Sequence, residues 1–230
     1  MKLVITACIF LVTMGFAGPN EFKPADVAKY LPEDCVILDC GAHNGLTSRF
    51  LARAFPKATV LAVEADPTVF CKLRRCTRAY KRIRAFHYAL CDKNGSIGFY
   101  MNLNKRRHSH QGCIYPRSDD RSAWRIPLRN EPVDVPAITL DKLCEDKGIE
   151  AVHLMHLDMQ GGEYVMLKES KKILDTTNVI FTEVLFKNVY EGAPQYPQLK
   201  ELLEDRGFKQ IELYHYDNMG DALFIRESLL

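Results

Sequence analysis

The sequence predicts an α/β fold with a doubly wound, mostly parallel seven-stranded sheet and an antiparallel C-terminal hairpin. From residue 35 onward, short apolar runs alternate with amphipathic stretches of helical length, which is typical of strand-helix units around a parallel sheet. An apolar run ending at Asp39 also passes through a glycine-spaced turn into a helix, as in sheets that bind ligands at their carboxyl edge. The chain of 230 residues, 47% of them hydrophobic, is long enough for one well-buried domain and short for two.

The secondary-structure elements can be read in order along the chain. Pro67 is favourable at the start of a helix, Gly207 ends the last helix, and the final two apolar runs indicate the antiparallel hairpin. We expect strands at 36–39, 59–64, 83–90, 96–101, 153–158, 179–185, 208–214 and 222–225, and helices at 45–55, 67–78, 140–147, 163–175 and 198–206.

The longest irregular stretch covers residues 102–130. Long loops inside compact domains are often lids or substrate-binding elements, so we expect Arg107 and His110 to bind substrate. A disordered basic insertion is the alternative.

The first 17 residues are predicted to lie outside this fold. Lys2 precedes an apolar run that ends in the small residues Gly15 and Ala17, a pattern typical of a cleaved secretory signal peptide. The run is shorter than the roughly 20 residues that cross a bilayer as a helix. We therefore expect a signal peptide or N-terminal hydrophobic segment at 1–17, an extension at 18–34, one domain at 35–230, and export through the secretory pathway. A cytoplasmic protein with a buried N-terminal helix is the alternative.

The cysteines do not predict a metal site or a disulfide framework. Seven of the eight would remain after cleavage, an odd number, and none has paired metal-ligand spacing. Several fall in predicted buried strands, which suits free thiols that pack as small apolar side chains.

The turn after the first strand predicts a cofactor site. Its pattern, Asp39-x-Gly41-x-x-x-Gly45, lacks the three glycines of the dinucleotide fingerprint and adds a carboxylate that would repel a diphosphate. A cofactor carrying an ammonium group suits Asp39 better, either directly or through water. Glu64, at the end of the second strand, is placed to accept hydrogen bonds from ribose hydroxyls. The alternative is a structural turn in which Asp39 caps a helix.

Four segments together resemble the FkbM-type family of class I S-adenosylmethionine-dependent methyltransferases, which have a Rossmann-like fold. They are VILDCGAHNG at 36–45, VLAVEADP at 60–67, HLDMQGGEYVML at 156–167 and VIFTEV at 179–184. The resemblance covers about residues 36–225. It implies that S-adenosylmethionine is the cofactor and that a hydroxyl on a sugar, glycan or other small molecule is the acceptor. Ala42 and Asn44 in the turn, and Ala89 after the third strand, join the expected cofactor-binding set.

The later motif supplies the candidate catalytic residues. Asp158 ends a strand beside the expected cofactor cleft, where a carboxylate can orient a hydroxyl, accept its proton or help to hold a cation. Glu163 opens the next helix, where it also interacts favourably with the helix dipole, and Glu183 ends the following strand as a possible substrate ligand. The family more often has lysine at the position of His156. Because a neutral histidine can accept a proton near neutral pH, where lysine normally stays charged, His156 is a further candidate base. The alternative is that His156 is a hydrogen-bonded core residue.

Other functions remain open from the sequence. Residues 72–84 hold seven basic side chains and suggest RNA methylation, although a solvated helix face explains them more simply, and the net charge of +2 gives no general argument for nucleic acid. A secreted binding protein that keeps the fold without turnover is a further alternative, and a NAD-dependent oxidoreductase is a weaker one. The sequence does not predict the oligomeric state.

Overall fold

A computed structural model describes residues 22–101, 112–118 and 131–230 of the protein. The predicted signal segment and the expected substrate ligands Arg107 and His110 lie outside the described residues and stay predictions. Within the described ranges, no helix combines the length and the apolar character needed to cross a membrane.

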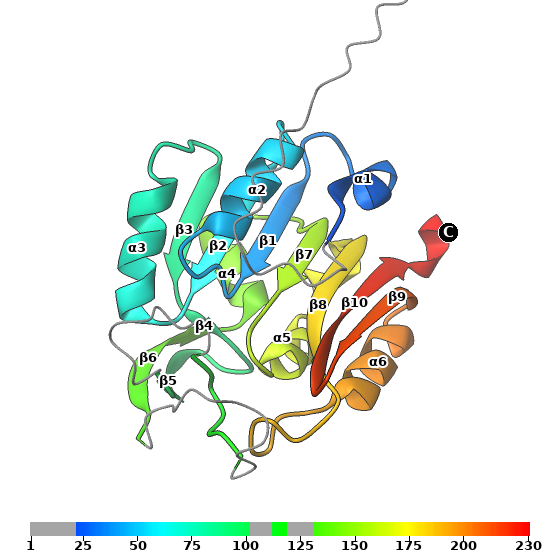
Figure 1. The fold of residues 1–230 in the computed structure, drawn as a ribbon. Coiled ribbons are helices and arrows are strands. Elements are labelled where there is room, and N and C mark those ends of the chain that lie inside the picture. The colour runs from blue at the N-terminus through cyan, green and yellow to red at the C-terminus, as the bar shows by residue number, and fades with distance from the viewer. Residues whose placement is uncertain (1–21, 102–111, 119–130) are drawn as a thin grey trace, which may run out of the picture.

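The elements form a seven-stranded sheet, a three-stranded sheet and covering helices (Figure 1). The strands are β1 Val36–Cys40, β2 Thr59–Glu64, β3 Ile83–His87, β4 Ala89–Leu90, β5 Gly95–Phe99, β6 Val133–Ile138, β7 Leu154–Leu157, β8 Val179–Leu185, β9 Phe208–Tyr216 and β10 Met219–Arg226. The α-helices are α1 Pro24–Val27, α2 Leu46–Ala54, α3 Pro67–Thr77, α4 Leu140–Lys147, α5 Glu163–Glu169 and α6 Tyr196–Asp205, and the 3-10 helices are η1 Ala28–Tyr30, η2 Leu174–Thr176 and η3 Glu227–Leu229.

The large sheet has the strand order β3-β2-β1-β7-β8-β10-β9. Its first five strands are parallel, and β10 pairs antiparallel with both β8 and β9. The predicted doubly wound sheet with an antiparallel C-terminal hairpin is therefore confirmed. β1 and β7 are neighbours, although more than a hundred residues separate them in the chain, and their carboxyl ends meet at the edge where ligands bind in such sheets.

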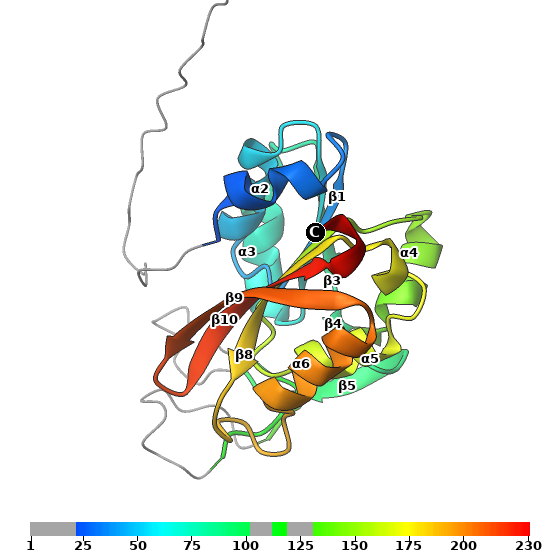
Figure 2. The same ribbon diagram turned by 90° about the vertical axis from the view of Figure 1, so that its right-hand side faces the viewer.

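Helices cover both faces of the large sheet (Figure 2). One core lies under α4, α5 and α6 and includes Leu38, Met155 and Phe224; the other lies under α1 and α2 and includes Ile37, Leu154 and Phe181. The alternation of neighbouring strand residues between these two cores is the period-two pattern of a strand that is buried on both faces.

The predicted strand 83–90 is wrong as a single element. β3 ends at His87, and β4 leaves the large sheet to pair parallel with β6, which also pairs antiparallel with β5. The sequence did not predict β6, whose interior holds a proline at position 136, a residue that is rare inside strands.

The expected helix 163–175 is too long. The helix α5 ends at Glu169, and the hydroxyl of the next residue, Ser170, donates to the carbonyl of Met166 at 2.7 Å. Such a hydroxyl competes for helical carbonyls, and the chain continues through turns into η2.

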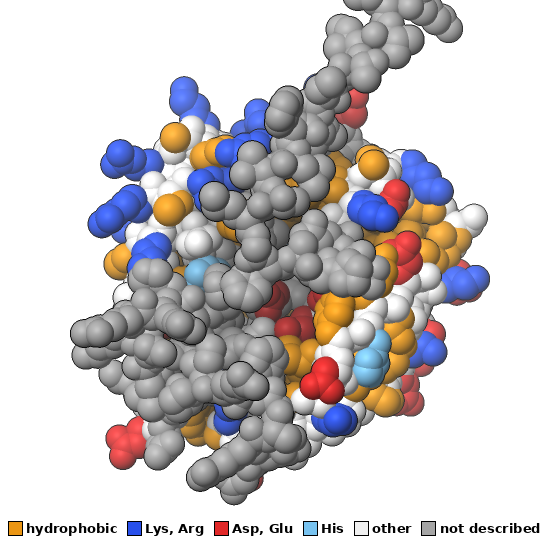
Figure 3. Space-filling model, in the orientation of Figure 1, with side chains coloured by type: hydrophobic (Ala, Val, Ile, Leu, Met, Phe, Trp, Pro, Cys, Tyr) orange, Lys and Arg blue, Asp and Glu red, His pale blue; other side chains and the backbone are white. Residues whose placement is uncertain are grey.

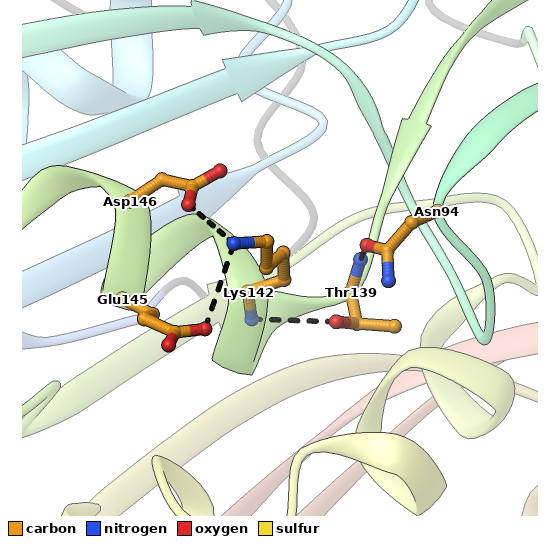
Figure 4. Close-up of polar contacts among 5 residues, drawn as sticks. All are labelled: Asn94, Thr139, Lys142, Glu145 and Asp146. Carbon is orange, nitrogen blue, oxygen red and sulfur yellow. Dashed lines mark hydrogen bonds and ion pairs between the residues drawn. The ribbon is translucent and has the colours of Figure 1, made fainter.

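The start of α4 is joined to the turn before β5 (Figure 4). The side chain of Thr139 accepts a hydrogen bond from Lys142 N at 3.3 Å and so caps the helix, while its own backbone N–H donates to Asn94 Oδ1 at 3.0 Å. Lys142 Nζ lies 2.6 Å from Asp146 Oδ1 and 3.6 Å from Glu145 Oε2, exposed pairs that contribute little to stability. Asn94 thus ties the turn before β5 to this helix.

Replacing Phe224 by alanine is expected to lower the free energy of unfolding by about 3 to 5 kcal/mol, because the ring is fully buried and a cavity would remain. Leu46→Ala is the control, since that side chain is 63% exposed, and its effect should stay within about 0.5 kcal/mol. Urea unfolding followed by circular dichroism measures both. Similar losses in the two variants would contradict the packing described here.

Candidate functional site

The turn between β1 and α2 lies in close contact with the end of β7. Gly41 has a φ of 76°, and a Cβ atom on it would lie 1.9 Å from the carbonyl oxygen of Asp158. Gly41 N and Ala42 N both donate to Val63 O at 3.0 Å, which fixes the turn against the end of β2. Glycine is therefore required at position 41 by the backbone of β7 as well as by the positive φ.

Gly45, the second glycine of the turn, packs against α3. A Cβ atom there would lie 2.7 Å from Thr77 Cγ2 and 2.9 Å from Leu73 Cδ1, so its missing side chain makes room for α3. Asn44 accepts a hydrogen bond from Leu46 N at 3.1 Å and supports the start of α2.

A cavity of about 610 Å³, including its open mouth, adjoins this turn. Three of the predicted cofactor residues, Gly41, Glu64 and Ala89, line it, and so does Asp158. The remaining lining residues are Cys40, His43, Val63, Ala65, Asp66, Val69, Tyr88, Leu90, Phe99, Gly112, Ile114, Met159, Gln160 and Gly162. Sequence reasoning missed the walls formed by Phe99 and Ile114, because they come from the small sheet and from the stretch that was predicted to be irregular.

Glu64 presents a buried carboxylate to this cavity. Its two oxygens accept hydrogen bonds from His43 N at 2.9 Å and Asp66 N at 2.8 Å. Burial raises the pKa of Glu64 to about 7, and these backbone N–H donors work in the opposite direction. Each carboxylate oxygen can accept a second hydrogen bond, so the residue fits the predicted role toward ribose hydroxyls.

Asp39 lies below the turn and is 1% exposed. The hydroxyl of Ser48 donates to its Oδ2, and His156 Nδ1 lies 3.2 Å from its Oδ1. Asp39 therefore joins α2 and β7 to β1. The predicted contact between Asp39 and the ammonium group of the cofactor stays a prediction.

His156 packs in an aromatic environment. Its ring stacks on Phe181 with centroids 5.7 Å apart and faces the edge of Phe22 at 6.5 Å. Burial alone would lower the pKa of His156, but the hydrogen bond to Asp39 and the charge of Asp39 outweigh it and raise the pKa. The pairing with Asp39 and the two aromatic neighbours fix the position of the ring, so the geometry favours a positioning role for His156 over that of a base.

Carboxylates gather where β7, β8 and β10 meet, beside the cavity. Gln160 Nε2 donates to Asp158 Oδ1 at 2.8 Å and to both carboxylate oxygens of Glu183 at 3.1 Å. Asp221 lies opposite Glu183 in the register of β8 and β10. Because β10 runs antiparallel, a residue near its start reaches the edge where the parallel strands end. Acidic side chains are visible near the middle of this face (Figure 3).

Burial and mutual repulsion raise the pKa values of Glu163 and Glu183. Burial raises the pKa of Glu183 well above its usual range, and the charges of Asp158, Glu163 and Asp221 raise it further. Burial also raises the pKa of Glu163 to about 7. Asp158, in contrast, is exposed toward the cavity.

Glu163 mainly braces the loop. Its Oε1 accepts a hydrogen bond from Met159 N at 2.5 Å, and the residue is 3% exposed. The structure thus brings Asp158 and Glu183 together as possible acceptor ligands and places Glu163 behind them. From the sequence, Gln160 had no role beyond its place in a motif, and Asp221, which directly precedes the predicted strand 222–225, was not singled out.

The sheet order, the glycine turn and the acidic end of β2 define a class of protein: α/β proteins that bind a nucleoside-containing cofactor at the carboxyl edge of the sheet. The family model described as the methyltransferase FkbM domain matches residues 39–209. The chain therefore belongs to the FkbM methyltransferase family, and the predicted S-adenosylmethionine-dependent methyltransferase function is confirmed.

Individual relatives agree with this assignment. The chain is similar to the 2-O-methyltransferase NoeI of Sinorhizobium fredii, with 29% identity over 199 residues that cover 85% of this chain and 81% of that protein. Among solved structures, the fibrillarin pre-rRNA processing protein of Methanococcus jannaschii superposes with a TM-score of 0.53 at 14% identity, covering 86% of this chain and 69% of that one. Aeropyrum pernix fibrillarin in complex with S-adenosylmethionine gives a TM-score of 0.50 at 12% identity, with 87% and 74% covered. These two likenesses concern the fold alone.

The cavity fits S-adenosylmethionine. Glu64 provides acceptors for ribose hydroxyls, the side chains of Val69, Phe99 and Ile114 provide apolar walls suited to a purine, and Gly41 leaves backbone exposed to the ligand. Among the described residues, no group of three or more His, Cys, Asp or Glu side chains is arranged to hold a metal ion.

Gly41→Ala is expected to destabilise the protein and to weaken S-adenosylmethionine binding at least tenfold, because the new methyl group would push the β1 and β7 loops apart. Gly192→Ala is the matched control: Gly192 has a similar φ of 79° but no atom within 4 Å of a Cβ position, so it should cost only about 1 to 2 kcal/mol of backbone strain. Thermal unfolding and calorimetric titration compare the two variants. Equal losses of stability and of cofactor binding in the two variants would contradict the importance of the contact between Gly41 and Asp158.

Binding of S-adenosylmethionine is expected to tighten between pH 6 and pH 8, because Glu64, with a pKa of about 7, becomes a better acceptor when ionised. Glu64→Gln should weaken binding at pH 8 by roughly tenfold or more and lose its share of the pH dependence. The amino group of the cofactor also titrates, but it does so in both experiments. The difference between the calorimetric pH profiles of the two proteins therefore isolates the contribution of Glu64. Parallel pH profiles for the two proteins would rule out the role of Glu64.

Proposed function

We propose that this methyltransferase transfers a methyl group to a hydroxyl of a sugar or glycan. The observation that carries the proposal is the carboxylate cluster of Asp158, Glu183 and Asp221 beside the cofactor cavity, with Asp158 and Glu183 joined by Gln160. Similarity to a 2-O-methyltransferase supports a hydroxyl acceptor.

The chemistry of the cluster suits a polyhydroxylated acceptor. Ionised carboxylates accept hydrogen bonds strongly, and a sugar offers several hydroxyl donors in fixed positions. Asp158 is exposed to the cavity, whereas Glu183 is half-buried behind it. An acceptor hydroxyl can therefore reach Asp158 directly, while a neighbouring hydroxyl is held by Glu183.

The residues of the chain then have separate tasks. S-adenosylmethionine supplies a methyl group on a sulfonium, which is already an activated leaving group, so alignment of the acceptor oxygen is the main requirement. The Asp158 carboxylate orients the hydroxyl and accepts its proton at a carboxylate oxygen as the new ether bond forms. Glu163 and Gln160 hold the loop that carries Asp158.

Nucleic acid is a less suitable acceptor for this site. The side chains beside this part of the cavity are the carboxyl groups of Asp158, Glu183 and Asp221, and an ionised carboxylate repels a phosphate. The basic side chains of residues 72–84 lie on α3, the following turn and β3, and the cavity that they line does not include Asp158 or Glu64.

The test is transfer of a labelled methyl group from S-adenosylmethionine to a panel of mono- and oligosaccharides, with an RNA oligonucleotide as the competing acceptor. We expect alkali-stable methyl ethers on a sugar. Asp158→Asn should lower kcat about 100-fold or more, while the Kd for S-adenosylmethionine changes less than threefold.

Asp146→Asn is the control, because Asp146 is an exposed carboxylate on α4 that pairs only with Lys142 in the contacts described above. Its kcat should equal that of the unmodified protein. Methyl transfer to RNA alone, or full activity of Asp158→Asn, would overturn the proposal.

A further inference from the structure

We propose that Gln160 is a positioning residue that joins Asp158 and Glu183 into one hydrogen-bonded acceptor-binding unit, with Tyr190 fixing the orientation of its amide. This inference rests on the proposed function, because it concerns the carboxylates that receive the acceptor. It adds a residue that acts on the acceptor through its neighbours.

The side chain of Gln160 is satisfied at both ends. Its nitrogen donates to Asp158 at 2.8 Å and to the two oxygens of Glu183 at 3.1 Å, and its Oε1 accepts a hydrogen bond from the hydroxyl of Tyr190 at 2.5 Å. The reverse amide orientation would turn the carbonyl oxygen toward two carboxylates. The network therefore determines which way the amide points.

The backbone of Gln160 is also held in place. Its φ is 56°, a left-handed conformation that non-glycine residues rarely adopt. The thiol of Cys113 donates to its carbonyl oxygen at 2.7 Å, and both Cys113 and Tyr190 are fully buried. A strained residue persists when its surroundings over-determine it, and such residues cluster at functional sites.

The segment 112–118 anchors this arrangement from the other side. Ser118 N donates to Val189 O at 3.1 Å, and Glu191 N donates to Pro116 O at 2.8 Å. Gly112 and Ile114 from the same segment line the cofactor cavity. The segment 112–118 thus supports Gln160 and also forms part of the lining of the cofactor cavity.

Electrostatics gives Gln160 a further effect. Two carboxylates side by side repel each other, and a shared N–H donor reduces that repulsion. Burial and the charges of Asp158, Glu163 and Asp221 raise the pKa of Glu183, whereas the Gln160 hydrogen bond lowers it. The other charged groups around the unit are His156, which interacts with Asp221, and Arg117, which interacts with Tyr190.

A Gln160 that only braced the loop, without donating to Glu183, would leave the protonation of Glu183 unchanged in the folded protein, so that protonation is the decisive readout. The full chain is labelled with glutamate carrying ¹³C at the carboxyl, and the Glu183 signal is assigned with Glu183→Gln. Gln160→Met, which keeps the length of the side chain and removes its donors, should raise the titration midpoint of Glu183 by about one pH unit or more.

The chain offers a matched control. Gln210 also accepts a hydrogen bond from a tyrosine hydroxyl, that of Tyr196, but on β9 and α6. Gln210→Met should leave the Glu183 midpoint unchanged. If Gln160→Met fails to fold, Tyr190→Phe decides: it should move the midpoint in the same direction by a smaller amount.

Kinetics supply a second readout with any sugar that the methyl-transfer assay identifies. Gln160→Met should lower kcat about tenfold to 100-fold at pH 7, keep the Kd for S-adenosylmethionine within threefold, and move the pH optimum upward. An unchanged Glu183 midpoint in folded Gln160→Met, or in Tyr190→Phe where the methionine variant does not fold, would overturn the inference. The titration needs no acceptor, so failure of the sugar assay would count against the proposed function alone.

Discussion

The contact between Gly41 and the carbonyl of Asp158 is the constraint on which the rest of the site depends. It brings the turn after β1 against the loop after β7 at backbone distance, with no room for a side chain. Both residues line the cofactor cavity, and Gln160 joins Asp158 to the carboxylate of Glu183 beside it. Asp158 thus takes part twice, because its backbone forms the contact and its side chain lines the cavity where we propose that the acceptor binds.

The two halves of the site are supported by different means. The cofactor half relies on backbone: donors from His43 and Asp66 hold Glu64, and glycine at position 41 keeps the turn close to β7. The acceptor half relies on side chains, since an amide, a tyrosine hydroxyl and a thiol hold the carboxylates in place. A buried side-chain network of this kind costs free energy if any of its polar groups lacks a hydrogen-bond partner, and it is rigid when every group has one. Rigid carboxylates suit the alignment of an acceptor oxygen.

The large sheet could be predicted from sequence because its central strands are buried on both faces and appear as continuous apolar runs separated by amphipathic helices. Gly41, Glu64 and Asp158 could be singled out for the same reason, since each follows or ends such a run. The small sheet could not: the proline inside β6 argues against a strand, and β4 has only two residues. The pairing of His156 with Asp39 depends on the contact between β1 and β7, and no local pattern links residues so far apart in the chain.

The insertion of β10 between β8 and β9 has a consequence for the order in which the chain can assemble. β9 is synthesised before β10, yet every contact that joins it to the sheet as a strand passes through β10. Until residues 219–226 have left the ribosome, β8 presents an open edge and β9 has no neighbour to pair with. The step that closes the core around Phe224 is therefore the same step that delivers Asp221 to Glu183, so the acceptor side is completed only when the sheet itself is complete.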